Sequence, residues 1–194
     1  AQRAVPANDP HRPIKAFLNE HAALFGHDAR ALDQARITRS FITHHNGLAT
    51  VAWQQEVDRI PVFGAILVGH ITKDGELVSL SSGLVPDPRA AVHRGSRRVA
   101  VNRAVADQSA EHAIVQAAAN LGETLPPDQI APRTDPVTAG AEFLFYVAPG
   151  LLGDIAVRRM WLPMDRATLR LCWEVILKSA RLNRMFRVMI DADT

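Results

Sequence analysis

The sequence predicts an α+β fold of two modules, each with one helix packed on an antiparallel sheet. Two amphipathic helical stretches are each followed by strand-like segments, which indicates helix-on-sheet layers. A segment rich in Pro, Arg and small residues separates the two sets, as is typical of a connector. A chain of 194 residues, 47% of them hydrophobic, is long enough for two cores. We therefore expect a first domain over 10–85, a linker over 86–103 and a second domain over 104–194.

The first module begins with a helix that opens at Asp9-Pro10 or Arg12-Pro13 and ends at Gly26. A shorter helical stretch is expected over 29–36. Strand chemistry follows over 43–56, 60–71 and 76–82, which predicts a three-stranded antiparallel meander. Asp74-Gly75 indicates a tight primed turn, because Gly adopts positive φ without steric cost. The apolar stripe of the first helix consists of Ile14, Phe17, Leu18, Leu24 and Phe25.

The second module begins with a helix capped by Asp107 or Ser109 and ended by Gly122. Four strands are expected after it, over 142–147, 155–162, 167–177 and 185–192. Apolar residues alternate with Arg170, Cys172, Glu174 and Lys178 along the third strand, and only a period of two puts the apolar set on one face. Those apolar residues are Leu169, Leu171, Trp173, Val175 and Leu177.

Composition excludes several classes of function. The net charge is only +2, and the basic stretch over 89–103 lacks aromatic residues that could stack on bases, so nucleic-acid binding is not expected. The longest apolar run, 60–68, is too short to cross a bilayer. One cysteine, Cys172, allows no internal disulfide. The first fifteen residues contain no apolar run, so we expect any secretory signal to have been removed.

The segment from His44 to Phe63, with His70 and Lys73–Val78, resembles the fungalysin/thermolysin propeptide motif. The resemblance depends on a Gln-rich strand, an Ile-Pro-Val-Phe strand entry, a strand-ending His and an Asp-Gly hairpin in the family's order. One departure is Arg59, because the family usually has Gly in that turn, and a non-Gly residue disfavours positive φ. The motif residues are His44, Asn46, Gly47, Trp53, Pro61, Phe63, His70, Asp74 and Gly75.

The second half is similar to a PepSY domain, which commonly follows this motif in fungalysin-type zinc metallopeptidase precursors. The similarity depends on the Ala-rich helix over 109–122, the strand around Trp173 and the ending Val188–Ala192. The resemblance implies two cystatin-like modules that bind a metalloprotease catalytic domain in cis, help it to fold and inhibit it. It also implies a secreted, periplasmic or extracellular location, with zinc in a catalytic domain outside this chain and no cofactor within it.

The sequence offers no self-sufficient active site. A gluzincin protease needs His-Glu-x-x-His on one helix to hold zinc and activate water, and this pattern does not occur. His44 and His45 are adjacent, so in a strand they point to opposite faces, and ordinary surface roles are favoured over a composite site with His21 and His70. We therefore expect no catalytic residue and no metal ligand.

Contact with a protease is the hypothesis for a small set of polar residues near the two sheets. Gln54 and Gln55 are as well explained by bonds across the sheet. Trp53 and Trp173 are expected in the cores and Cys172 as an inert thiol. A stand-alone secreted or periplasmic binding or inhibitor module with a PepSY-like fold is the alternative function. The candidate protease-contact residues are Gln54, Gln55, Arg187, Asp191 and Asp193.

Overall fold

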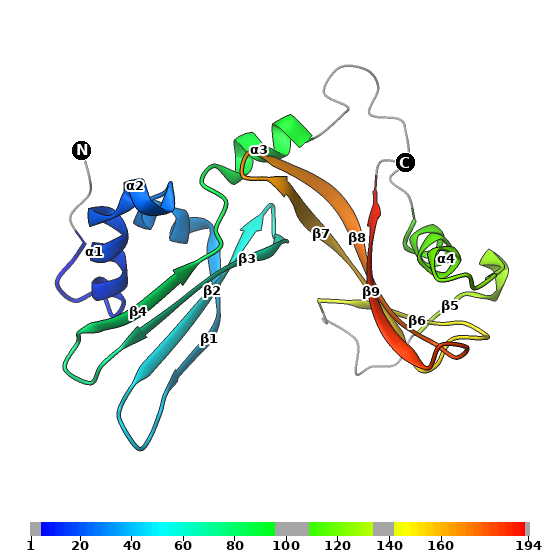
Figure 1. Cartoon of the computed structure of the whole chain (residues 1–194), viewed down its shortest axis with the longest axis horizontal. Helices are drawn as coiled ribbons and strands as arrows, with labels where there is room; N and C mark the ends of the chain where they lie inside the picture. Colours follow the sequence, from blue (N-terminus) through cyan, green and yellow to red (C-terminus); the bar gives the residue numbers. More distant parts are fainter. Residues whose placement is uncertain (1–4, 96–108, 134–141, 193–194) are drawn as a thin grey trace. The chain divides into compact units, whose positions relative to one another are not determined.

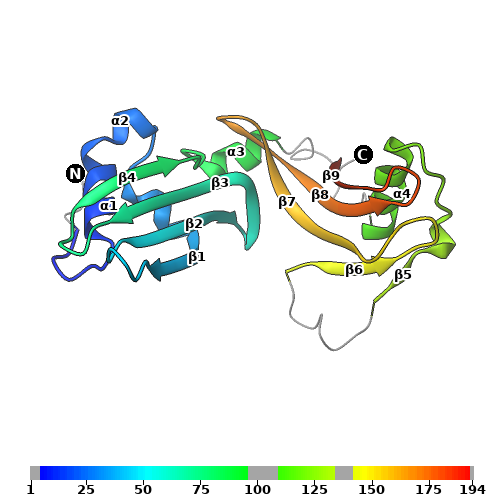
Figure 2. The same ribbon diagram turned by 60° about the horizontal axis from the view of Figure 1, so that its bottom comes forward.

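A computed structural model describes residues 5–95, 109–133 and 142–192. Contacts divide the chain into a first unit, 1–95 with 163–169, and a second unit, 96–162 with 170–194. Each unit has helices and an antiparallel sheet (Figures 1 and 2), which confirms the α+β class. No helix among the described residues is long and apolar enough to span a membrane.

The first unit packs its helices on one face of a four-stranded sheet in the order β1-β2-β3-β4. Ile14 and Leu18, one turn apart on the first helix, are fully buried. The Ile14 side chain fills the space where Gly69 has no Cβ, so the helix lies very close to the strand. The elements are α1 (Arg12–Glu20), α2 (Ala22–Phe25), the 3₁₀ helix η1 (Ala29–Gln34), β1 (Ala35–Ile42), β2 (Ala49–Val57), β3 (Ile60–Ile71), β4 (Leu77–Ser82) and α3 (Pro88–Gly95).

The expected antiparallel meander is present as β2, β3 and β4, but β1 adds a fourth strand to it, and the first six residues of the strand expected over 43–56 form a turn. The Thr43 amide donates to the Leu48 carbonyl (2.8 Å), which closes a hairpin between β1 and β2. Gly47 adopts a φ of 68° there, and Asn46 Oδ1 accepts from the Leu48 amide (3.1 Å). The helix expected over 29–36 ends at Gln34, because Ala35 and Arg36 already pair with β2.

The helix ends follow the expected local chemistry. Gly26 ends α2 with a φ of 76°. Ser109 caps the helix α4 (Ala110–Asn120) by accepting a hydrogen bond from the His112 amide (3.2 Å). At the other end of α4, Gly122 has a φ of 73° and the Glu123 amide donates to the Ala118 carbonyl (3.0 Å). Asp107, the other predicted cap, lies outside the described residues.

The second unit packs α4 on one face of a sheet ordered β5-β6-β7-β8-β9. Its core places the helix residues Ala113, Ile114 and Ala117 against strand residues that include Trp173 and Val175. Trp173, Val175 and Leu177 lie in this core as the alternation predicted, but Cys172 and Glu174 on the other side of the strand are buried too. The elements are α4 (Ala110–Asn120), η2 (Pro127–Gln129), β5 (Ala131–Pro132), β6 (Leu144–Val147), β7 (Ile155–Asp165), β8 (Thr168–Ser179) and β9 (Arg184–Asp191).

The stretch expected to be a linker begins with an ordered helix, α3. Arg94 Nε donates to the Ala167 carbonyl (2.6 Å), so this helix contacts the turn between β7 and β8. Gly95 lies so close to Leu169 that a Cβ would overlap the Leu169 backbone. These contacts explain why residues 163–169 belong to the first unit. Residues 96–103 of the expected linker lie outside the described part of the chain.

Candidate partner-contact site

The first sheet has one face covered by α1 and one open face. The register places Phe41, Thr50 and His70 side by side across β1, β2 and β3 on the open side. Phe41 and Ile66 expose 46% and 42% of their surface there, although both are large and apolar. The Thr50 hydroxyl and His70 Nδ1 are 2.9 Å apart, which fixes the predicted strand-ending His on this face. Phe41 and Ile66 are therefore the exposed apolar side chains on this face that a partner could contact.

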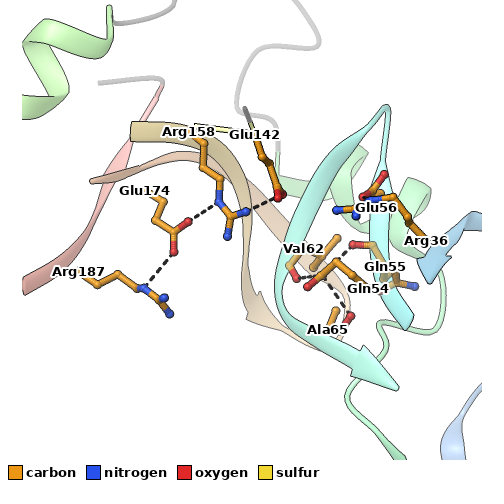
Figure 3. Close-up of polar contacts among 10 residues, drawn as sticks. All are labelled: Arg36, Gln54, Gln55, Glu56, Val62, Ala65, Glu142, Arg158, Glu174 and Arg187. Atoms are coloured by element: carbon orange, nitrogen blue, oxygen red, sulfur yellow. Dashed lines mark hydrogen bonds and ion pairs between the residues drawn. The ribbon is translucent and has the colours of Figure 1, made fainter. Parts of the chain in front are cut away.

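The neighbouring residues Gln54 and Gln55 point to opposite faces of β2, as strand geometry requires. Gln54 is half-buried on the open side, and its Nε2 donates to the carbonyls of Val62 (2.7 Å) and Ala65 (3.3 Å) (Figure 3). These carbonyls flank a bulge in β3. The bulge lies where the register shifts, because Gln54 pairs with Ile66 but Glu56 pairs with Pro61. Gln54 therefore holds the bulge of β3 in place, and its position allows contact with a partner.

Gln55 has no exposed surface, so it cannot contact a partner in the folded chain. Its Nε2 donates to the Val85 carbonyl (2.9 Å) and its Oε1 accepts from the Val85 amide (2.9 Å). The side chain thus satisfies both backbone groups of a residue thirty positions away, after β4 has ended. This geometry corrects the hypothesis of a protease contact at Gln55, which instead fastens the chain after β4 to β2.

The turn between β2 and β3 keeps positive φ without the glycine that the propeptide family usually has. Asp58 and Arg59 have φ values of 52° and 66°. Two consecutive positive φ values are typical of the primed turns that suit the twist of a hairpin. Arg59 thus adopts the positive φ that a non-Gly residue disfavours, and the expected change of turn geometry does not occur, because the β2–β3 pairing on both sides imposes the conformation.

The Asp74-Gly75 turn also differs from its prediction, because only Gly75 has positive φ, at 83°. The Thr72 amide donates to the Glu76 carbonyl (2.8 Å), so the hairpin loop has three residues. A primed turn would have a two-residue loop. The register also shifts between His70 and Ile71, as expected for a bulge beside such a loop.

The remaining motif residues lie at these places in the first unit: Trp53 and Pro61 are buried, Phe63 is 37% exposed and His44 lies in the β1–β2 turn.

The second unit buries a carboxylate on the sheet face opposite α4. Glu174 has no exposed surface, and its Oε2 accepts from Arg158 Nε at 2.5 Å (Figure 3). Arg187 Nε lies 3.1 Å from the other oxygen, Oε1, as an ion pair without hydrogen-bond geometry. Arg158 also donates to Glu142 Oε1 (2.6 Å), and its guanidinium lies 4.3 Å from the centroid of the Phe143 ring.

This network was missed by sequence reasoning, which placed Glu174 on a solvated polar face. Arg187, a predicted contact residue, is exposed yet paired with Glu174. Asp191 lies 3.3 Å from Arg170 Nη1 on the same face, and Asp193 is outside the described residues. Cys172, expected on the polar face, is buried between these pairs, as an inert thiol would be. The signal available in the sequence for a buried carboxylate was an acidic residue flanked by two large apolar residues, Trp173 and Val175.

Two local ion pairs shift carboxyl pKa values in the first unit. The Lys15 ammonium donates to Asp9 Oδ2 (2.6 Å) and lowers the pKa of Asp9 below its ordinary value. A hydrogen bond from Arg30 similarly lowers the pKa of Asp28.

Within the described residues, no group of three His, Cys, Asp or Glu side chains is placed to hold a metal ion. Among the predicted histidines, His21 lies against the Phe17 ring at 4.2 Å and His70 bonds Thr50.

Comparison with protein families places a known motif on the first sheet. Residues 33–84 match the family model of the Fungalysin/Thermolysin Propeptide Motif, which spans β1 to β4. The segment is therefore similar to a non-catalytic propeptide motif, and no catalytic family matches this chain. The match does not reach the second unit.

Comparison with solved structures gives a weaker likeness. The chain is similar to the Bacillus megaterium YpeB C-terminal domain, with 13% sequence identity and a TM-score of 0.33. The alignment covers 100% of this chain and 63% of that structure, so the chain spans less than two thirds of its length. A comparison with curated proteins finds no match.

Proposed function

We propose that this chain is the propeptide of a secreted fungalysin-type zinc metalloprotease and acts on the catalytic domain in cis as chaperone and inhibitor. The match of residues 33–84 to the propeptide motif is the observation on which the proposal depends. The second unit is proposed to be PepSY-like, so that both units are cystatin-like modules of one prosegment. The zinc and the hydrolytic groups are assigned to the catalytic domain.

The open face of the first sheet supports this role physically. A propeptide needs a rigid surface that holds one conformation before it meets its partner, because ordering on binding reduces affinity. The bonds of Gln54 to Val62 and Ala65 and the bond of Thr50 to His70 fix side chains on this face. Covalent linkage raises the local concentration of the surface, so a moderate affinity is enough until cleavage.

The reading frame beyond Thr194 separates the propeptide from a stand-alone secreted or periplasmic binding module. The propeptide proposal expects a segment with His-Glu-x-x-His on one helix, where two His ligands share a face and the Glu activates water. A reading frame that encodes no such segment would overturn action in cis and favour the stand-alone module.

The functional test uses that catalytic segment, expressed separately and unfolded in denaturant. Dilution with the purified chain is expected to restore folded catalytic domain, measured by its near-ultraviolet circular dichroism, while peptidase activity stays low. Dilution alone is expected to yield aggregate. The control is Gly69→Val, because its side chain would displace Ile14 and distort the first sheet. Equal recovery with the chain, with the control and with buffer would contradict the chaperone role.

A further inference from the structure

The two edges of the first sheet are protected to different degrees. The β1 edge has Arg36 and Arg39, and its register shifts between Ile37 and Arg39. Charged residues and bulges in the middle of an edge strand discourage pairing with another chain. The β4 edge, Leu-Val-Ser-Leu-Ser-Ser, has neither charge nor proline. Its register shift is confined to the start of the strand, so Ser79–Ser82 stay regular.

The register shows which backbone groups of β4 point away from the sheet. The Gly83 amide donates to the Ile66 carbonyl (2.9 Å), so this pair exchanges ladder hydrogen bonds. In an antiparallel ladder such pairs alternate with pairs whose amide and carbonyl groups point outward. Ser79 and Ser81 therefore bond to β3, and Leu80 presents its amide and carbonyl to the free edge. Among the described residues, β4 pairs with β3 alone.

An apolar groove of about 480 Å³ lies beside this edge. Its volume is within the range of about 300–1,000 Å³ that is usual for binding sites. Leu24 and Val78 expose 76% and 58% of their surface at the groove, so apolar surface is available for burial. No residue that lines it is charged: Phe17, Leu24, Phe25, Leu77, Val78, Ser79 and Leu80.

We infer that the free edge of β4 and this groove bind an extended, uncharged protein segment by strand addition. The backbone of the segment pairs with Leu80, and alternate apolar side chains enter the groove between β4 and the helices. Ser79 and Ser81 share the opposite face with His70 and Val68, so side chains on that side of the segment are small and polar. The absence of charge in the groove selects against Lys, Arg, Asp and Glu at the inward positions. This inference does not depend on a protease partner.

The test uses a blocked synthetic peptide of about six alternating valine and threonine residues, with one lysine at each end for solubility. Saturable binding to the full chain is expected by calorimetry. Hydrogen exchange at the Leu80 amide is expected to slow in the complex, because that amide becomes paired. A peptide with proline at its centre is expected not to bind, since it lacks a ladder donor.

The variant Val78→Lys places a charge at the groove, and we expect it to weaken peptide binding about tenfold, which corresponds to roughly 1.4 kcal/mol. Ile42→Lys is the matched control, because Ile42 is a 67% exposed apolar residue at the β1 edge. Its affinity is expected to equal that of the unchanged chain. No saturable binding, or equal weakening by both variants, would overturn the inference. So would sedimentation of the unchanged chain as a dimer that Val78→Lys dissociates, because a second copy would then occupy the edge.

Discussion

Each unit contains a long polar side chain that is fully buried, but the two are satisfied in different ways. In the first unit, Gln55 is neutral and both its polar atoms bond to the Val85 backbone. In the second unit, Glu174 is charged and depends on two arginines, with one oxygen lacking a well-aligned hydrogen bond. A buried carboxylate needs its cations far more than a buried amide needs its partners. The second unit should therefore be more sensitive to the loss of one side chain.

The largest effect is expected for Arg158→Met, which leaves the Glu174 carboxylate buried with only Arg187 nearby. Breaking a buried ion pair from one side costs about 3–5 kcal/mol of unfolding free energy. Urea denaturation followed by hydrogen exchange should show faster opening in 170–192 and no change in 49–82. The double variant Arg158→Met with Glu174→Met is the control and should recover most of the loss, because no charge remains buried. A loss in the double variant as large as in the single one would contradict this account.

A smaller effect is expected for Gln55→Leu, which keeps the side-chain volume and leaves the Val85 amide and carbonyl unpaired. Unsatisfied buried groups of this kind cost about 1–3 kcal/mol. The loss should appear as faster exchange over 49–85 and leave the second unit unchanged. Gln54→Leu is the matched control on the open face, where water can replace the lost hydrogen bonds, so its loss should be smaller. If both variants lose equal stability, burial is not what distinguishes the two glutamines.

The β2–β3 turn should give a gain instead of a loss. Arg59 has a φ of 66°, which costs a non-Gly residue about 1–2 kcal/mol. Arg59→Gly removes that strain but makes the unfolded chain more flexible, so a net stabilisation of about 0.5–1 kcal/mol is expected. Thermal unfolding of the full chain would measure it. Arg59→Ala keeps the strain and should not stabilise the protein; a gain in that variant would point to the side chain and not to the backbone.

Local patterns were enough to predict much of this fold, and nonlocal partners explain what they missed. The alternation from Leu169 to Leu177 located β8, and the capping residues Ser109 and Gly26 located helix ends, because these signals lie within a few residues of the feature they specify. The turn over 43–48 was missed although it contains Asn46 and Gly47, since apolar residues on both sides suggested one long strand.

The candidate site was harder to predict than the fold for the same reason. Gln54 and Gln55 are indistinguishable in sequence, and only the position of Val85 in space makes one of them a buried clamp. Glu174 is likewise specified by Arg158 on one neighbouring strand and Arg187 on the other. The register of a sheet brings such groups together, and no spacing along the chain encodes it.

The smallest effect sharpens the comparison through pH and concerns His11, a partly buried histidine of the first unit. His11 lies edge-on against Trp53, with ring centroids 5.0 Å apart, and burial lowers the pKa of His11 below its ordinary value of 6.5. The unfolded chain therefore binds a proton more readily than the folded chain, and the stability of the first unit should fall as pH drops below about 6.5. His11→Phe keeps the ring contact and should remove this pH dependence of stability, measured by thermal unfolding followed by Trp53 fluorescence. The lowered pKa values of Asp9 and Asp28 affect stability only near and below pH 3.8. His45→Gln, at an exposed turn position, should keep the slope; an unchanged slope in His11→Phe would show that another group titrates in this window.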